Sequence, residues 1–254
     1  MGERSFFVES GAIQGERAEI RGPIAHQIGR VLRLRPGDSV DLLDNSGALF
    51  VAVLTDVSRD TVRARIVERR RPETEPEAHV DLYQALLKGQ KMDLVLQKAT
   101  EIGVSRFVPV LSERCVSRPS HGDLEGKVER WQAIVREAAE QSGRAVIPEI
   151  GHLEEFDRAL ISASAADLAV IAWEEERGVS LARLLRDWSR GSDAASSHIA
   201  LFIGPEGGFS PLEAERAVAA GLRTVGLGPR ILRAETAAIV ATTAVLWETG
   251  GLGG

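Results

Sequence analysis

The stretch Gly204-Pro205-Glu206-Gly207-Gly208-Phe209-Ser210 follows an apolar segment, 199–203, and decides the fold class of this chain. The apolar segment has the length and composition of a buried strand. After it, Ser210 is expected to cap a helix, with Pro211 at the first helical position and Glu213 completing a capping box. The glycines let the backbone approach a ligand closely. The stretch therefore predicts a strand, a ligand-binding turn and a helix of an α/β domain.

A second loop of this kind follows the next predicted strand, 224–227. It reads Gly228-Pro229-Arg230-Ile231-Leu232-Arg233-Ala234-Glu235-Thr236 and leads into an Ala/Thr-rich helix. One such loop is more simply a tight turn, but two loops that close consecutive strand–helix units favour a binding site. No P-loop is present, and no Gly-x-Gly-x-x-Gly follows the first strand, so a nucleotide-dependent enzyme or dehydrogenase is disfavoured.

The same alternation of strands and helices extends over the whole chain from residue 80 onward. Strands are expected at 80–85, 106–111, 168–172, 199–203 and 224–227, and helices at 92–102, 124–141, 153–161, 181–188, 212–220 and 235–247. Such alternation is typical of a mostly parallel sheet covered by helices on both faces.

The first part of the chain has a different pattern, of short strands. They are expected at 6–8, 39–43, 48–54 and 61–67, with a helix at 24–34 and a hairpin turn at 44–47. This pattern predicts a small β-barrel or sandwich. The charged, proline-containing segment 69–77 is interpreted as a linker. We therefore expect two domains, 1–72 and 73–254.

Composition restricts the function classes. The chain has 254 residues, of which 44% are hydrophobic, with no apolar run long enough for a membrane span and no secretory signal. The single Cys115 excludes an intramolecular disulfide and a cysteine-based zinc site. A cytoplasmic protein, without membrane association and without a metal, is expected.

The net charge of -6 is unevenly distributed. Residues 1–72 carry 12 Arg and no Lys against 10 acidic residues. Guanidinium groups suit phosphate contacts, but a GC-rich genome that favours Arg over Lys explains the same bias equally well.

At the two glycine-containing loops the chain resembles the RsmE family. The matching motifs are 204–210 and Leu227-Gly228-x-Arg230-Ile231-Leu232-Arg233-x-Glu235-Thr236-Ala237. Further matches are Lys88-Gly89-x-Lys91-Met92-Asp93, Gln97-Lys98-x-Thr100-Glu101-Ile102-Gly103-Val104, Glu140-Gln141-Ser142-x-Arg144, and His26 followed by Val31-Leu32-Arg33-Leu34-Arg35-x-Gly37-Asp38. The resemblance therefore spans nearly the whole chain in order.

The resemblance implies an α/β SPOUT methyltransferase domain with a parallel sheet and a C-terminal trefoil knot, preceded by a small β-barrel PUA-like domain. It implies S-adenosylmethionine as cofactor, and N3 of a uridine in 16S ribosomal RNA of the small ribosomal subunit as the methylated position. A homodimer is implied as well. The cofactor-binding residues would be Ile203, Gly204, Pro205, Glu206, Gly207, Leu227, Gly228, Ile231, Leu232 and Arg233.

Chemistry assigns further roles. Uracil N3 must lose its proton, and a nearby guanidinium would stabilise the resulting anion. Arg233 is the first candidate for this role and Arg144 the second, each with a structural salt bridge as the alternative. Glu206 and Glu235 are candidate proton acceptors, although either could order its loop or helix instead, and water could take the proton. RNA contacts are expected from His26, Arg30, Arg33, Arg35, Lys88 and Lys91.

Two rival functions stay open. The chain could be a catalytically inactive RNA-binding or ribosome-assembly module, although such a protein need not keep both cofactor loops. It could also be a SPOUT enzyme that methylates another RNA position, such as a ribose 2′-hydroxyl.

Overall fold

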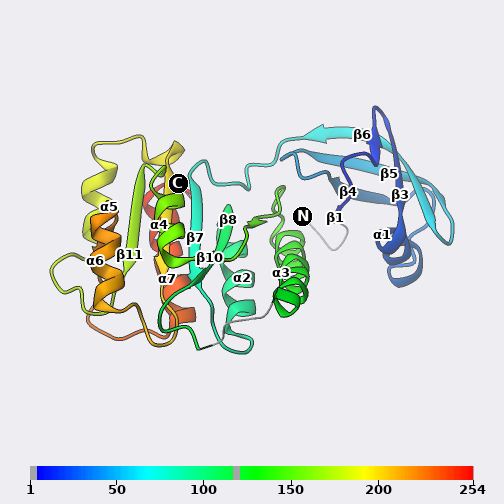
Figure 1. Cartoon of the computed structure of the whole chain (residues 1–254). Helices are drawn as coiled ribbons and strands as arrows, with labels where there is room; N and C mark the ends of the chain where they lie inside the picture. The colour runs from blue at the N-terminus through cyan, green and yellow to red at the C-terminus, as the bar shows by residue number, and fades with distance from the viewer. Residues whose placement is uncertain (1–4, 117–120, 254) are drawn as a thin grey trace. The chain divides into compact units, whose positions relative to one another are not determined.

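The computed structural model describes residues 5–116 and 121–253 and divides the chain into two compact units (Figure 1). Unit 1 consists of residues 1–75 together with 139–147, and unit 2 of 76–138 together with 148–254. The expected domains, 1–72 and 73–254, did not include this return of residues 139–147 to the first unit.

Unit 1 is built on one six-stranded sheet. Its strands are β1 (Ser5–Phe7), β2 (Ile13–Gln14), β3 (Arg17–Arg21), β4 (Ser39–Leu43), β5 (Leu49–Val57) and β6 (Thr61–Arg70), in the order β1-β4-β5-β6-β3-β2. The β1–β4 pair is parallel and the other pairs are antiparallel. The predicted strands and the hairpin turn at 44–47 are confirmed, whereas β2 and β3 were not expected.

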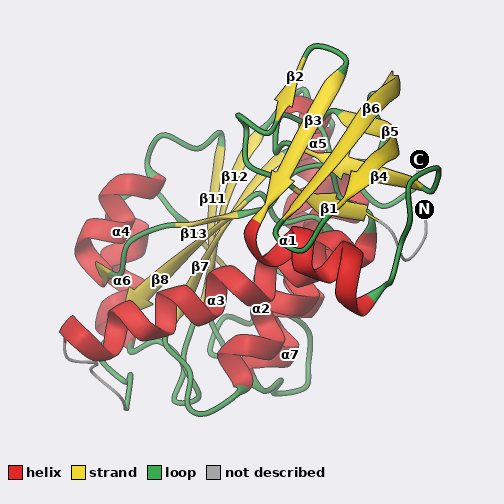
Figure 2. Ribbon diagram, turned by 90° about the vertical axis from the view of Figure 1, so that its right-hand side faces the viewer, coloured by secondary structure: helices red, strands yellow, loops and turns green. Residues whose placement is uncertain are grey.

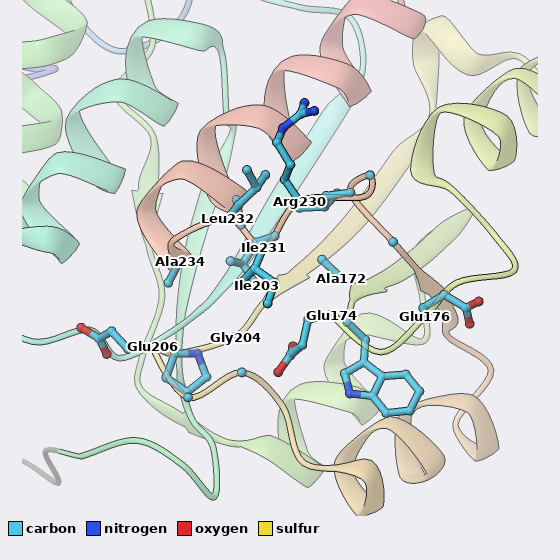
Figure 3. Close-up of a pocket in the computed structure, with 18 of the residues that line it drawn as sticks. Ala172, Glu174, Glu176, Ile203, Gly204, Glu206, Arg230, Ile231, Leu232 and Ala234 are labelled. Carbon is cyan, nitrogen blue, oxygen red and sulfur yellow. The ribbon is translucent and has the colours of Figure 1, made fainter.

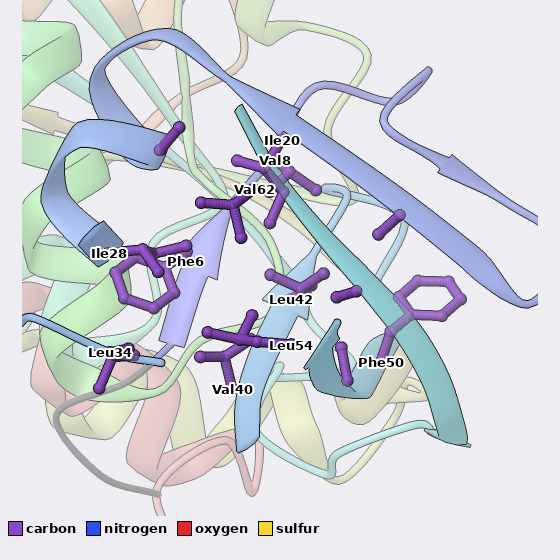
Figure 4. Close-up of a cluster of buried hydrophobic side chains, with 14 of the residues drawn as sticks. Phe6, Val8, Ile20, Ile28, Leu34, Val40, Leu42, Phe50, Leu54 and Val62 are labelled. Atoms are coloured by element: carbon purple, nitrogen blue, oxygen red, sulfur yellow. The ribbon is translucent and has the colours of Figure 1, made fainter. Parts of the chain in front are cut away.

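The sheet of unit 1 curves around a core of buried side chains on one of its faces (Figure 4). Phe6 of the first strand in the sheet order and Ile20 of the fifth belong to the same buried cluster as Leu42, Leu54 and Val62 of the strands between them. Side chains from distant strands can meet only if the sheet bends strongly.

The predicted helix 24–34 is shorter and less regular than expected. An α-helical turn, α1 (Gly22–His26), continues into a π-helical turn, η1 (Gln27–Val31). Arg33 then adopts a φ of 53°, in the left-handed region. The chain turns there because Leu34 is buried in the core and its amide donates to the carbonyl of Ile28.

Residues 139–147 join unit 1 through apolar contacts and hydrogen bonds. Ala139 and Ala145 are buried against Phe7, Leu43 and Leu49. The amide of Phe7 donates to Glu140 Oε1, and the amide of Ile147 donates to Asn45 Oδ1. The last turn of a helix that begins in unit 2 therefore belongs to the core of unit 1.

Unit 2 contains a seven-stranded sheet in which every described pairing is parallel. The strands are β7 (His79–Ala85), β8 (Arg106–Leu111), β9 (Glu149–Ile150), β10 (Glu154–Glu155), β11 (Leu168–Ala172), β12 (His198–Ile203) and β13 (Arg223–Val225). The order is β10-β8-β7-β12-β11-β13, with β9 also on β8. All five predicted strands are confirmed, while the two-residue strands β9 and β10 are too short to leave a pattern.

Helices cover both faces of this sheet (Figure 2). They are α2 (Lys91–Ile102), α3 (His121–Ser142), α4 (Phe156–Ala163), α5 (Leu181–Ser189), α6 (Pro211–Ala219) and α7 (Ala234–Glu248), with a 3-10 turn, η2 (Ala194–Ser196), before β12. Helices α4 and α6 pack on the face that carries Tyr83 and Phe202. Helix α7 lies over β12 on the opposite face, against α2 and α5. In the described parts of the chain, no helix is both long and apolar enough to cross a membrane.

Candidate functional site

A cavity of about 230 Å³ opens at the carboxyl ends of β11, β12 and β13 (Figure 3). The loops after these three strands form its walls because parallel neighbours end at the same edge of the sheet. The lining residues are Ala172, Trp173, Glu174, Glu176, Arg177, Ile203, Gly204, Pro205, Glu206, Gly207, Gly208, Gly226, Leu227, Gly228, Arg230, Ile231, Leu232, Ala234 and Ala237.

The β12 loop has the local structure that its sequence predicts. Ser210 Oγ accepts from the amide of Glu213, and the Glu213 carboxylate accepts from the amide of Ser210, so the expected capping box is confirmed. Gly208 has a φ of 65°, which favours glycine. A Cβ on Gly204 would lie 3.2 Å from the backbone of Gly208. The loop therefore folds tightly back on itself at the floor of the cavity.

The loop after β8 holds the β12 loop in place. The amide of Glu113 donates to Glu213 Oε1 at 2.8 Å, and Ser210 Oγ donates to Glu113 Oε2 at 2.6 Å. Arg114 Nη1 donates to the carbonyl oxygen of Gly207 at 2.8 Å. The sequence did not point to Glu113 and Arg114, because no local sequence pattern connects them to a loop nearly a hundred residues away.

The loop after β11 supplies the wall that the sequence analysis did not foresee. The Glu174 carboxylate lies against Gly208, in space that a Cβ there would occupy. Trp173 Nε1 is buried and has no hydrogen-bond partner among the described residues. The run of polar residues after a predicted strand was the available signal. Ligands bind at the carboxyl ends of strands in parallel sheets, so the position of this loop after a predicted strand also pointed to the site.

Glu176 ties the β11 loop to β13. Its carboxylate accepts from Thr224 Oγ1 at 2.8 Å and from the amides of Gly178 and Val179. These hydrogen bonds, above all the one from Thr224, lower the pKa of Glu176. Gly226 crosses this loop so closely that a Cβ would lie 2.6 Å from the carbonyl oxygen of Glu176. Two of the three cavity loops are thus locked together at Gly226.

The structure brings most of the predicted cofactor-binding residues to this cavity. The residues among them that line it are Ile203, Gly204, Pro205, Glu206, Gly207, Leu227, Gly228, Ile231 and Leu232. Arg233 is exposed at the N-cap of α7 and does not line it, although Arg230 does. Arg230 stood in the motif but was not proposed as a site residue.

The two predicted proton acceptors share one lysine. Lys91 Nζ lies 3.0 Å from Glu206 Oε1 and 3.9 Å from Glu235 Oε2. The amide of Lys88 also donates to Glu206 Oε1, at 3.1 Å. Burial raises the pKa of Glu206, but the hydrogen bonds from Lys91 and the backbone more than offset it, so the pKa is lowered. A carboxylate that is already ionised and paired is a weak base, which speaks against Glu206 as the proton acceptor.

Arg144 is part of the framework of unit 1. Its side chain is 5% exposed, and Nη2 donates to Glu75 Oε2 at 2.7 Å. The other oxygen of Glu75 accepts from the amides of Ala145 and Val146. This ion pair favours the structural alternative for Arg144, the partner of an acid, and a catalytic role for Arg144 stays an untested prediction. The described residues that line the cavity belong to unit 2.

Replacing Arg144 with Ala is expected to lower the free energy of unfolding by about 3 kcal/mol, because it leaves a half-buried carboxylate without its ion-pair partner. Urea denaturation measures the change. The exposed Arg71 of the same unit is the control, and Arg71→Ala is expected to stay within about 0.5 kcal/mol of the parent. An equally small change in the Arg144 variant would contradict the structural role.

Comparisons with known proteins identify the class of protein. Residues 74–246 match the family model of an RNA methyltransferase domain, and residues 20–67 match that of an RNA methyltransferase PUA domain. The chain is thus an RNA methyltransferase with a PUA domain, as its two units and the strand-end cavity indicate.

Individual proteins of similar sequence and structure identify the family to which the chain belongs. The ribosomal RNA small subunit methyltransferase E of Bacillus subtilis is 32% identical, over 96% of both chains, and that of Mycobacterium tuberculosis is 34% identical, over 94% and 90%. A crystal structure of the Neisseria gonorrhoeae enzyme bound to S-adenosyl methionine has a TM-score of 0.83 and 30% identity, and covers 97% of this chain and 98% of its own. The chain belongs to the ribosomal RNA small subunit methyltransferase E family, and the resemblance seen in the sequence is confirmed.

Proposed function

We propose that this protein transfers a methyl group from S-adenosylmethionine to N3 of a uridine in the 16S RNA of the small ribosomal subunit, in the cytoplasm. The observation that carries the proposal is the cavity enclosed by the loops after β11, β12 and β13. A similar structure, the Neisseria gonorrhoeae enzyme, was crystallised with S-adenosyl methionine. An inactive RNA-binding module would have no need of this cavity.

The residues around the cavity fit the cofactor chemically. Ile203, Leu232 and Ala237 offer apolar walls for the adenosine. Glu174 and Arg230 offer charges opposite to the amino and carboxylate groups of the methionine end. When bound, S-adenosylmethionine supplies an electrophilic methyl group on a sulfonium.

The transfer forms the bond from N3 to the methyl carbon, breaks the bond from sulfur to that carbon, and releases the N3 proton. Glu206 accepts a hydrogen bond from Lys91, and Glu235 Oε2 is buried 3.9 Å from the same ammonium. Solvent is therefore the proposed proton acceptor. Arg233 is the proposed stabiliser of the uracil anion, because it stands between Leu232 and Ala234, which line the cavity, and exposes its own side chain.

Finer features of the fold belong to the same proposal. A trefoil knot is supported by the path of the chain after β13, which lies at the edge of the sheet. Gly226 forms a β-bridge with Ser180. The chain then returns over β12 as α7, which packs against α2 and α5. A barrel in unit 1 is supported by the strong curvature of its sheet.

A homodimer is supported by an apolar groove between α5 and α7. Leu185, Ile239 and Thr243 line it beside Val240 and Trp247, whose exposed fractions are 41% and 69%. Exposed apolar side chains that gather in this way are typical of subunit interfaces. Sedimentation equilibrium tests the dimer, and a protomer mass at all concentrations would exclude it.

RNA binding is assigned to unit 1 through His26, Arg30, Arg33 and Arg35, all of which are exposed around α1 and η1. In unit 2, Lys88 is exposed, whereas Lys91 already pairs with two carboxylates. A contact from Lys91 to RNA would therefore compete with those ion pairs, and Lys88 is the better candidate of the two.

The triple variant Arg30→Ala, Arg33→Ala, Arg35→Ala is expected to weaken RNA binding and to reduce the log–log salt slope by about 0.7–0.9 per lost phosphate contact. Fluorescence anisotropy with a labelled 16S fragment at several salt concentrations measures this. The matched control removes Arg21, Arg63 and Arg70, exposed residues of the same unit that carboxylates already engage. Equal slopes for the two triple variants would place the RNA elsewhere.

The activity itself is tested with small ribosomal subunits from a strain that lacks the enzyme. Incubation with the protein and S-adenosylmethionine is expected to add one methyl group, and mass mapping of the digested RNA is expected to find it on N3 of a uridine. Methylation of a ribose or of another base would support the rival specificity. No methylation of subunits or of free RNA would support the inactive module.

A further inference from the structure

Two histidines and an aspartate converge at the amino ends of β7 and β12. His79 Nε2 lies 3.0 Å from Asp81 Oδ1, and His198 Nε2 lies 3.1 Å from Asp81 Oδ2. The two imidazole rings meet edge to face, with centroids 5.1 Å apart. Two imidazole nitrogens and one carboxylate thus point into one small volume.

Strand register places these residues together. His79 and Asp81 are two positions apart on β7 and share a face of the sheet. His198 is the direct partner of His79 on the neighbouring strand β12. The cavity lies at the carboxyl ends of the strands and this cluster at the amino ends, so the cluster has no part in the proposed methyl transfer.

The carboxylate of this cluster is buried, whereas its two imidazoles are partly exposed to solvent. The Asp81 side chain is 3% exposed, whereas those of His79 and His198 are 54% and 33% exposed. A buried carboxylate needs compensating positive charge or hydrogen bonds. The imidazoles supply the hydrogen bonds, and their exposed edges leave a route from solvent to the carboxylate.

We propose that His79, Asp81 and His198 form a binding site for a divalent transition-metal ion such as zinc. Zinc takes imidazole nitrogen and carboxylate oxygen ligands at about 2.0–2.2 Å. The three potential ligand atoms lie within 4.8 Å of one another. Tetrahedral coordination needs separations of about 3.4 Å, which small rotations of the exposed imidazoles provide. Solvent occupies the fourth position.

The donor set selects the class of ion. Imidazole nitrogen suits zinc, copper and nickel, whereas magnesium and calcium prefer ligand sets made of oxygen. On binding, the metal replaces the protons through which the imidazoles now contact Asp81. Neutral imidazoles and an ionised carboxylate are the forms that bind metals.

The positively charged side chain of Arg106 lies next to this proposed metal site. Arg106 Nη1 lies 3.8 Å from Asp81 Oδ2, while its Nε lies 3.5 Å from Glu149 Oε1. Glu149 is largely exposed and sits on β9, beside Arg106 on β8. The Arg106 side chain can therefore turn fully to Glu149 when a metal neutralises Asp81.

Such a site would link two strands from distant parts of the sequence, since Asp81 and His198 are 117 residues apart. The ligands converge only in the folded protein, so zinc is expected to stabilise the native state and raise its melting temperature. The sequence predicts no metal site, because its single cysteine excludes a cysteine-based zinc site and no spacing pattern connects His79 with His198.

The experiment is calorimetric titration of the untagged, chelator-treated protein with zinc chloride, together with cobalt chloride as a visible spectroscopic probe. The parent is expected to bind one zinc per chain and to show a rise in melting temperature with zinc. His79→Ala and His198→Ala are each expected to lower zinc affinity by at least about 100-fold, because loss of a residue that only hydrogen-bonds to a metal ligand already costs about 10–100-fold.

His152→Ala is the matched control, since His152 is an exposed histidine of the same unit that is not one of the three proposed ligands, and its loss should leave binding unchanged. His79 lies at the surface, so its removal leaves the core intact even if His198→Ala lowers stability. The proposal is overturned if the parent binds no zinc, or if both cluster variants bind it as tightly as the parent.

Discussion

Arg233→Ala is expected to slow methyl transfer by about 10²–10³-fold, the usual cost of removing one donor that stabilises a developing anion. Its affinity for S-adenosylmethionine should stay within a few-fold of the parent. The structure explains the difference. Its neighbours Leu232 and Ala234 line the cavity, while Arg233 does not line it and is exposed, so its guanidinium is free to meet the RNA base instead of the cofactor. Its guanidinium has no hydrogen-bonded or ionic partner among the described residues.

Single-turnover methylation of small ribosomal subunits across a pH range measures this effect. Raising the pH should partly rescue the Ala variant, because the uridine then ionises without help from the guanidinium. Arg233→Lys is expected to recover little, since an ammonium cannot reproduce the planar fork.

Arg230→Ala is the matched comparison. Arg230 lines the cavity, so its loss is expected to weaken cofactor binding first. If Arg233→Ala reacts at the parent rate, or fails only because the cofactor no longer binds, Arg233 is not the stabiliser of the uracil anion.

The second large effect is expected at Gly226. Gly226→Ala should weaken the binding of S-adenosylmethionine and slow methyl transfer by about 100-fold, because a displacement of about 1 Å at a site costs that much in rate. The new Cβ would stand 2.6 Å from the carbonyl oxygen of Glu176. A backbone atom cannot rotate away, so the β11 and β13 loops must separate. Calorimetric titration with the cofactor measures the loss.

Two further variants make this result interpretable. Gly191→Ala is the control, since its Cβ would meet nothing nearer than 3.9 Å in a surface loop. Ala237→Leu fills the cavity from α7 with a good helix former and leaves the loops alone. It should also weaken binding. Parent-like affinity in both Gly226→Ala and Ala237→Leu would mean that the cofactor binds elsewhere.

The sequence by itself determined the elements and caps that depend on neighbouring residues. The strand 199–203, the capping box of Ser210 and Glu213, and the hairpin turn at 44–47 all depend on interactions within a few positions. Local patterns record such interactions directly. The glycine-containing loops could be identified in the same way, and with them most of the cavity.

Only the tertiary structure decided which distant segments meet. Strand order brings Glu174 of the β11 loop to Gly208, and register brings His79 beside His198. The same is true of Glu75, which pairs with Arg144 and favours a structural role for that arginine. These contacts depend on the topology of the sheet and on the return of residues 139–147 to unit 1. Hydrophobic periodicity indicates only which face of an element is buried. It therefore predicts neither the strand order nor that return.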